Sequence, residues 1–254
     1  MLLQKTRRKY AVSHIETYGF TCYVNSIQMA DTITATYHYV MDSTEETIER
    51  TYSVEDYINT RMAYPDISDK ELALLKSLND YGWHAQVFLS DLRGWKLDEQ
   101  YKRMTDPYLT SYDTDSIASS LSSYKVSGDI NMQDIVKMSF SLALDSNTSI
   151  YLYVGTAEGY DGEFSAEVNG KPAEIITKPD GRRRIAVSGI PAHKLGDTYE
   201  VKISTTNGDS TVQISAMSYV YACLSKTSAT ELERNSAAAL YHYYAAAMAY
   251  KNNI

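Results

Sequence analysis

The segment Ser215–Tyr250, SAMSYVYACLSKTSATELERNSAAALYHYYAAAMAY, repeats a pattern already present at Ser53–Phe88, SVEDYINTRMAYPDISDKELALLKSLNDYGWHAQVF. The two segments align without a gap at an offset of 162 positions, so that Glu71 returns as Glu233. A repeated segment of this kind indicates a repeated structural unit. We therefore expect the chain to consist of two related halves.

Each copy of the repeat predicts a short helix followed by a long one. The short helices begin near Val54 and Ala216. The long helices open at Ser68 and Thr230, each with a glutamate three residues later, which is the pattern of a capping box. Apolar side chains then recur at the three- and four-residue intervals of a helix that packs on a core. They are Leu74, Leu75, Leu78, Tyr81, Ala85 and Phe88 in the first copy, and Ala237, Leu240, Tyr243, Ala247 and Tyr250 in the second.

Strand-like segments precede the helices in both halves. They alternate bulky with small or polar side chains and are rich in β-branched and aromatic residues. The predicted strands are 19–24, 33–39, 47–52, 130–144, 149–154, 199–204 and 211–214. Asn207-Gly208 predicts a tight hairpin turn between the last two strands, whereas we expect a longer turn between residues 39 and 47.

This order of elements predicts an α+β fold. Each half is expected to be an antiparallel β-sheet followed by a helical hairpin, and the halves are expected to pack with pseudo-twofold symmetry. The expected boundaries are 1–89 for the first unit, 90–129 for a structured crossover, and 130–254 for the second unit. A structureless loop as long as the crossover would be unusual in a compact domain, and its aromatic residues can hold it to the surface.

Composition narrows the classes of partner. The chain has 254 residues and a net charge of −8, which argues against a nucleic acid or an anionic membrane as the main partner. No apolar run reaches the length of a membrane span or a signal peptide, so we expect no membrane insertion. Cys22 and Cys223 are expected to be small core residues, and the alternative is a disulfide between the halves.

Catalytic motifs are missing from the sequence. The five histidines, at positions 14, 38, 84, 193 and 242, have no metal-binding spacing and are expected to be structural. Asp161 with Glu163, or Asp113 with Asp115, offers a weak acidic pair for hydrolysis. Short acidic runs at 113–115 and 145–147 lack the full calcium-loop pattern. We expect no catalytic residue, no metal and no cofactor.

Tyrosine dominates the aromatic residues, with 23 tyrosines against four phenylalanines and two tryptophans. Tyrosines on the helical stripes can fill a core while their hydroxyls reach its rim. Those on loops offer rigid, half-polar contact area to a protein or a sugar ring. The candidate ligand-binding residues are Trp95, Tyr101, Tyr108, Tyr112 and Tyr160.

Several stretches resemble a known but uncharacterised family. Tyr153-Val154, Ser215–Val220 and Ala239–Tyr250, together with Tyr52–Ile58 and Leu75–Gln86 in the first half, resemble a repeat-containing C-terminal module of secreted and cell-surface proteins from Gram-positive gut bacteria. The resemblance implies an extracellular or cell-surface setting and assigns no functional residue. Such modules follow a signal peptide and other domains, so we expect this chain, which shows no signal peptide, to be a piece of a larger protein.

Three hypotheses for function follow. The leading one is a noncatalytic extracellular binding or adhesion module that recognises a glycan or a host or bacterial surface protein through exposed aromatic residues. The second is a structural spacer or capping module beside a functional domain. The third is an acidic-pair hydrolase that uses Asp161 and Glu163.

Overall fold

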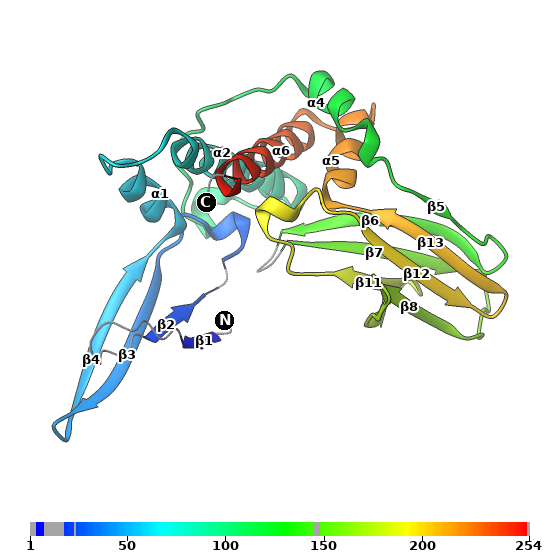
Figure 1. The fold of residues 1–254 in the computed structure, drawn as a ribbon, viewed down its shortest axis with the longest axis horizontal. Coiled ribbons are helices and arrows are strands. Elements are labelled where there is room, and N and C mark those ends of the chain that lie inside the picture. The colour runs from blue at the N-terminus through cyan, green and yellow to red at the C-terminus, as the bar shows by residue number, and fades with distance from the viewer. Residues whose placement is uncertain (1–3, 8–17, 23, 145–147, 253–254) are drawn as a thin grey trace.

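The computed structural model describes residues 4–7, 18–22, 24–144 and 148–252. These residues form an α+β fold in which the helices gather at one end of a β-sandwich (Figure 1). The α-helices are α1 (Val54–Met62), α2 (Asp69–Arg93), α3 (Leu97–Gln100), α4 (Thr114–Ser120), α5 (Ala216–Ser225) and α6 (Glu231–Lys251). Three short 3-10 helices are η1 (Ser26–Gln28), η2 (Ser122–Tyr124) and η3 (Ala192–Lys194).

All strand pairs in the described residues are antiparallel. A four-stranded sheet has the order β10-β11-β7-β6, and a five-stranded sheet has the order β5-β13-β12-β8-β9. Two further pairs, β1-β2 and β3-β4, stand alone. The bounds are β1 Gln4–Arg7, β2 Tyr18–Thr21, β3 Ile33–Met41, β4 Thr44–Tyr52, β5 Ser127–Asp129, β6 Ile135–Leu144, β7 Thr148–Thr156, β8 Phe164–Val168, β9 Lys171–Pro172, β10 Ile175–Thr177, β11 Arg183–Val187, β12 Tyr199–Thr205 and β13 Gly208–Ile214.

The two large sheets face each other across an apolar core. Leu152 of β7 and Ile185 of β11 belong to the same buried cluster as Val201 of β12 and Val212 of β13. The alternate side chains of these strands face away from that core, as period-two patterning requires. The cluster continues without a break into α5, where Met217 is fully buried, so the sandwich and the helices share one core.

The long helices α2 and α6 lie side by side (Figure 1). Ala85 of α2 and Ala238 of α6 are completely buried, and small side chains allow two helices to approach closely. Tyr81 and Tyr243, which correspond in the sequence repeat, stack with ring centroids 5.6 Å apart and planes inclined by 6°. The predicted apolar stripes therefore meet each other.

Hydroxyl side chains cap the four main helices, including the two long ones for which the sequence predicts a cap. Each N-cap hydroxyl accepts a hydrogen bond from the backbone amide three residues later. The caps are Ser53 of α1, Ser68 of α2, Ser215 of α5 and Thr230 of α6.

The reciprocal half of the capping box does not form where it was expected. It is present at Ser215, whose backbone amide donates to the Ser218 hydroxyl at 3.0 Å. The carboxylate of Glu71 instead binds Arg61, and Glu233 lines a cavity. The spacing located the helix ends correctly and assigned the wrong partner to both glutamates.

Two strand predictions need correction. The β3-β4 turn is no longer than the β12-β13 turn, because only Asp42 and Ser43 separate the strands, with φ of 50° and 64°. Those positive values are the ones that a tight hairpin turn requires. The strand predicted at 19–24 ends at Thr21, and Tyr23 lies outside the described residues.

The described residues do not form two symmetric halves, contrary to the expectation from the sequence repeat. The helices of the first half follow the two-stranded pair β3-β4, which projects away from the body in Figure 1. The helices of the second half follow both sheets of the sandwich. Residues 127–129 of the predicted crossover also join that sandwich as strand β5. Cys22 and Cys223 do not form a disulfide.

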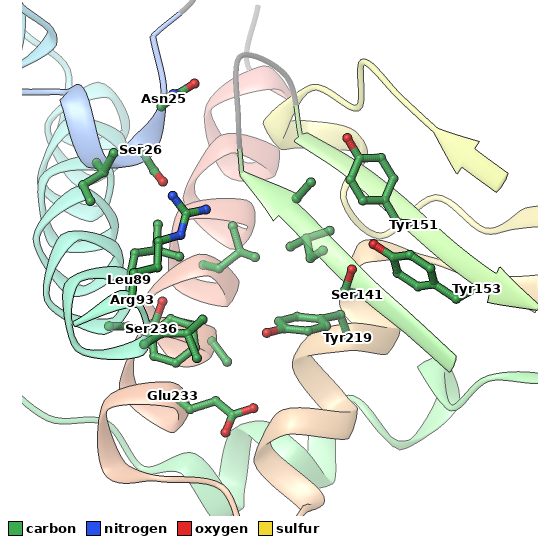
Figure 2. Close-up of a pocket in the computed structure, with 17 residues that line it drawn as sticks. Asn25, Ser26, Leu89, Arg93, Ser141, Tyr151, Tyr153, Tyr219, Glu233 and Ser236 are labelled. Carbon is green, nitrogen blue, oxygen red and sulfur yellow. The ribbon is translucent and has the colours of Figure 1, made fainter. Parts of the chain in front are cut away.

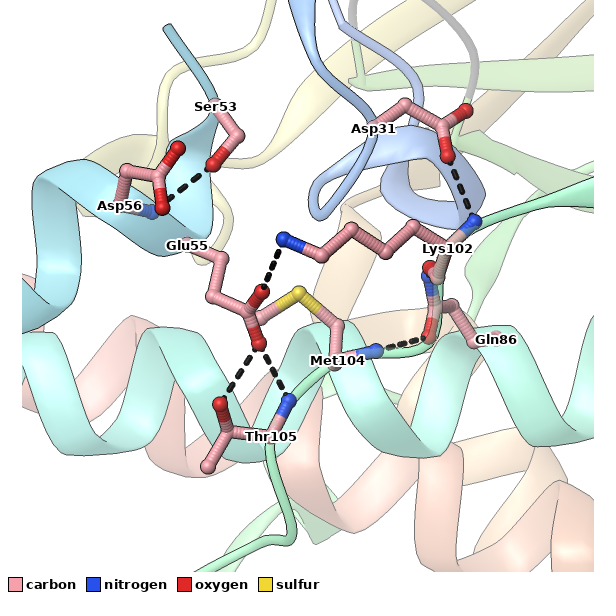
Figure 3. Close-up of polar contacts among 8 residues, drawn as sticks. All are labelled: Asp31, Ser53, Glu55, Asp56, Gln86, Lys102, Met104 and Thr105. Atoms are coloured by element: carbon pink, nitrogen blue, oxygen red, sulfur yellow. Dashed lines mark hydrogen bonds and ion pairs between the residues drawn. The ribbon is translucent and has the colours of Figure 1, made fainter. Parts of the chain in front are cut away.

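The crossover is structured, and buried polar side chains hold it in place (Figure 3). Glu55, 5% exposed, accepts hydrogen bonds from the backbone amide and the hydroxyl of Thr105 at 2.5 and 2.6 Å. Its second oxygen lies 3.4 Å from the ammonium of Lys102. Gln86, fully buried, accepts from the Met104 amide at 2.9 Å. The hydrogen bonds that the Glu55 carboxylate accepts are charge-assisted, and such bonds are among the stronger contacts in proteins.

Candidate functional site

A cavity of about 350 Å³ opens between the helices and the four-stranded sheet (Figure 2). The C-terminal turns of α2 and residues 25–27 form one side, strands β6 and β7 form the other, and α5 and α6 close the base. Ligand pockets in proteins commonly occupy such junctions between structural units. The cavity is therefore the candidate binding site.

The cavity lining combines apolar side chains with hydroxyl groups. Leu142 and Leu240 contribute apolar surface. The hydroxyl-bearing side chains that line the cavity are Ser26, Ser141, Tyr151, Tyr153, Tyr219 and Ser236. A hydroxyl can both donate and accept a hydrogen bond, so this wall can match a ligand that carries hydroxyls of its own.

The sheet side of the cavity follows from strand periodicity. Tyr151 and Tyr153 alternate along β7 and point to the face opposite the sandwich core, and Ser141 of β6 pairs with Tyr151. Arginine side chains cover the tyrosine rings. Arg184 lies 4.4 Å from the centre of the Tyr151 ring, and Arg182 lies 5.0 Å from that of Tyr153. These contacts fix the rings and leave both residues on the cavity wall, as Figure 2 shows.

Arg93 lies at the other side, in the last turn of α2. Its guanidinium stacks 4.5 Å from the Trp95 ring, and Trp95 in turn lies 5.6 Å from Tyr101. Gly94 adopts φ of 62° and ends the helix, which turns the chain back so that Trp95 can reach Arg93. Two of the predicted ligand-binding residues thus adjoin the cavity through this arginine.

Glu233 is the acidic residue of the cavity wall. It lies in the first turn of α6, and one of its carboxylate oxygens accepts a weak hydrogen bond from the Cys223 thiol at 3.6 Å. Burial raises the pKa of Cys223 to about 12, so this thiol stays neutral. Burial likewise raises the pKa of Tyr219, which keeps its phenol protonated.

The other predicted ligand-binding residues lie elsewhere. Tyr108 is 50% exposed and contacts the Lys76 ammonium, which lies 5.1 Å from its ring centre. Tyr160 lies on a sandwich loop, where its hydroxyl donates to the Glu163 carbonyl at 2.6 Å. Tyr112 lies between α2 and α6. The structure therefore brings together Trp95 and Tyr101, leaves Tyr108 and Tyr160 on separate surfaces, and packs Tyr112 against the helices, where its hydroxyl is buried.

Tyr112 belongs to a buried polar cluster. Its ring lies 5.3 Å from that of His84 and 5.1 Å from that of His242. Asp80, 3% exposed, accepts from the Tyr108 amide at 2.6 Å, and a ring nitrogen of His84 contacts the Leu109 carbonyl at 2.9 Å. Burial raises the pKa of Asp80 and lowers the pKa of both histidines. These contacts anchor the crossover, and they bury His84 more deeply than the expected helix-surface or half-buried role.

The acidic residues proposed for hydrolysis or calcium lie outside the cavity. Asp161 and Glu163 are exposed on the sandwich loop. Asp113 caps α4, and Asp115 forms an ion pair with Arg234 at 2.9 Å. Among the described residues, no three His, Cys, Asp or Glu side chains gather to hold a metal ion. The run 145–147 lies outside the described residues.

Most of the cavity wall was not predicted as a site. Glu233 was interpreted as a capping residue, and Tyr151 and Tyr153 were interpreted only as strand residues. Their alternation was the available signal, because two tyrosines two positions apart must lie on one face. Arg93 carried no signal, since its place depends on how α2 packs against α6.

No helix within the described part of the chain is long and apolar enough to cross a membrane. Comparison of the chain with known protein families finds no matching family, and comparison with curated proteins finds no similar sequence.

Proposed function

We propose that the chain is a noncatalytic binding module that takes a hydroxyl-rich ligand, the terminal residue of a glycan, into the cavity between α2, α6 and β7. The observation that carries this proposal is a cavity lined by both hydroxyl-bearing and apolar side chains. A sugar ring offers hydroxyls around its rim and C–H groups on its faces, which need these two kinds of surface.

A binding role suits the cavity better than a hydrolytic one. Glycoside hydrolysis uses two carboxylates roughly 5–10 Å apart. Glu233 is the acidic residue on the described cavity wall, and the pair Asp161 and Glu163 is on a separate loop. Trp95 and Tyr101, beside Arg93, extend the recognition surface to a second sugar unit. The proposed setting is the bacterial cell surface, in keeping with the family resemblance.

The test is an array of plant polysaccharides, mucin glycans and host secreted proteins probed with the purified chain. Tyr153→Phe removes one cavity hydroxyl and keeps the ring, so it should weaken a glycan hit about fivefold or more, the worth of one hydrogen bond. Tyr108→Phe is the matched control, because it makes the same change outside the cavity. A hit weakened by the Tyr108 variant and untouched by the Tyr153 variant would move the site to the crossover.

A second proposal is a structural spacer or cap beside a functional domain. The stacking of Tyr81 on Tyr243 supports it, because this contact ties α2 into the core that α6 shares with the sandwich, which makes the chain one rigid body. If this role is the only one, a well-folded chain should bind none of the array. A specific hit abolished by cavity variants would reject it as the sole function.

A further inference from the structure

The repeat places two glutamates at equivalent positions, and among the described residues only Glu71 has a cationic partner. Glu71 forms a two-pronged ion pair with Arg61, with nitrogen–oxygen distances of 2.5 and 2.9 Å. This pair joins α1 to the first turn of α2. It is the geometry that a carboxylate and a guanidinium favour. In the first half, therefore, the glutamate has a structural role.

In the second half the arginine is missing. The residue that corresponds to Arg61 is Cys223, whose neutral thiol is the described hydrogen-bond partner of the Glu233 side chain. Arg234, the neighbour of Glu233 in sequence, turns away to Asp115 and to the Leu224 carbonyl. Among the described residues, no lysine or arginine forms an ion pair with Glu233.

A partly buried carboxylate without a counter-ion is unfavourable unless something else compensates it. Glu233 lines the cavity, and Tyr219 and Ser236 lie on either side of it (Figure 2). Their hydroxyl oxygens can accept hydrogen bonds from a ligand that reaches Glu233. Arg93 lies toward the other end of the cavity, where it favours an electron-rich group. The cavity therefore has an acidic end and a basic end.

We propose that Glu233 is an ammonium-binding subsite, and that the ligand is an amino sugar whose amine is free and protonated. This inference rests on the proposed function and names its ligand class. The ammonium of the sugar forms an ion pair with Glu233, as the Arg61 guanidinium does with Glu71. An acetylated amine carries no charge, so the subsite distinguishes the free amine from the acetamide.

The experiment compares two saccharides by isothermal titration calorimetry, a trimer of glucosamine and a trimer of N-acetylglucosamine. The intact chain should bind the free-amine trimer at least about tenfold more tightly, as expected for a hydrogen-bonded charge pair. Glu233→Gln keeps the size of the side chain and removes its charge, so the preference should disappear.

Glu71→Gln is the matched control. It makes the same substitution at the equivalent position, where the carboxylate is paired and lies away from the cavity. It should lower the unfolding temperature and leave the tenfold preference intact, whereas Glu233→Gln should change the preference with a smaller effect on unfolding.

The outcomes separate the two proposals. If the intact chain binds both trimers equally, or prefers the acetylated one, the ammonium subsite is wrong while the saccharide site stands. If neither trimer and no glycan on the array binds, the proposed function fails and the subsite with it. Because the intact chain already decides between the trimers, the test does not depend on the folding of any variant. Equal binding of a lysine-containing tripeptide would overturn the assignment to an amino sugar.

Discussion

Tyr112 and Tyr160 show how one residue type serves opposite purposes in this chain. The Tyr112 hydroxyl is buried and has no hydrogen-bond partner among the described residues, whereas the Tyr160 hydroxyl donates to Glu163 and accepts from the Thr206 amide at 3.1 Å. A buried hydroxyl without a partner keeps the cost of its lost hydration. The sequence alone does not distinguish the buried tyrosine from the exposed one.

Replacing each of these tyrosines with phenylalanine should therefore act in opposite directions. Tyr112→Phe should raise the free energy of unfolding by about 1 kcal/mol, because it removes an unsatisfied polar group. Tyr160→Phe should lower it by about 1 kcal/mol, because it breaks two hydrogen bonds. Urea unfolding measures both. A loss of stability in the Tyr112 variant would show that its hydroxyl has a partner.

The buried histidines make stability depend on pH. Burial lowers the pKa of His84 and His242, so the folded protein takes up fewer protons than the unfolded chain as the pH falls below about 6.5. The free energy of unfolding should then fall between about pH 7 and pH 5. Burial raises the pKa of Asp80, so this carboxyl should make the free energy of unfolding rise as the pH falls, at pH values lower than those at which the histidines titrate.

His84→Gln keeps a side-chain N–H for the Leu109 carbonyl and removes one titrating group. Its unfolding free energy should depend less steeply on pH over that interval than that of the unmodified chain. Equal slopes, measured by urea unfolding at several pH values, would mean that His84 titrates alike in the folded and unfolded states.

At the level of elements, the helix caps were the most predictable feature. Ser53 and Ser215 correspond in the repeat and are both buried, yet only Ser215 has the reciprocal hydrogen bond. Ser215→Ala should cost about 1–2 kcal/mol of unfolding free energy, and Ser53→Ala should cost about 1 kcal/mol or less. Chemical denaturation of the two variants compares them. The opposite order would show that the second hydrogen bond contributes little.

The errors at this level have physical causes. The β3-β4 turn is tight although Asp42-Ser43 lacks the glycine that marks such a turn, because aspartate also tolerates positive φ. Both glutamates were assigned to capping boxes because the spacing fits, but an ion pair with Arg61 competes successfully for Glu71. Local patterns locate the ends of an element, and partners from other elements decide what a long side chain binds.

At the level of the whole molecule, the α+β class could be predicted, whereas the sandwich strands β8 to β11 and the cavity could not. Its wall combines residues from η1, α2, β6, β7, α5 and α6, which are far apart in the chain. Only the packing of α2 on α6 and of both on the sheet brings them together. The predicted aromatic residues were those on segments expected to be exposed. They therefore include Trp95 and Tyr101, the neighbours of Arg93, but not the hydroxyl-bearing residues across the cavity.

The proposed function requires that a saccharide bind in this cavity. The most direct measurement is a titration of the 15N-labelled chain with the glycan that binds best, followed by the amide chemical shifts. We predict shifts confined to the cavity lining, which is residues 25–27, the last turns of α2, strands β6 and β7, and the facing turns of α5 and α6, together with Trp95 and Tyr101 beside it. Shifts confined to the β3-β4 hairpin or to the loop of Tyr160, with the cavity unchanged at saturation, would contradict it.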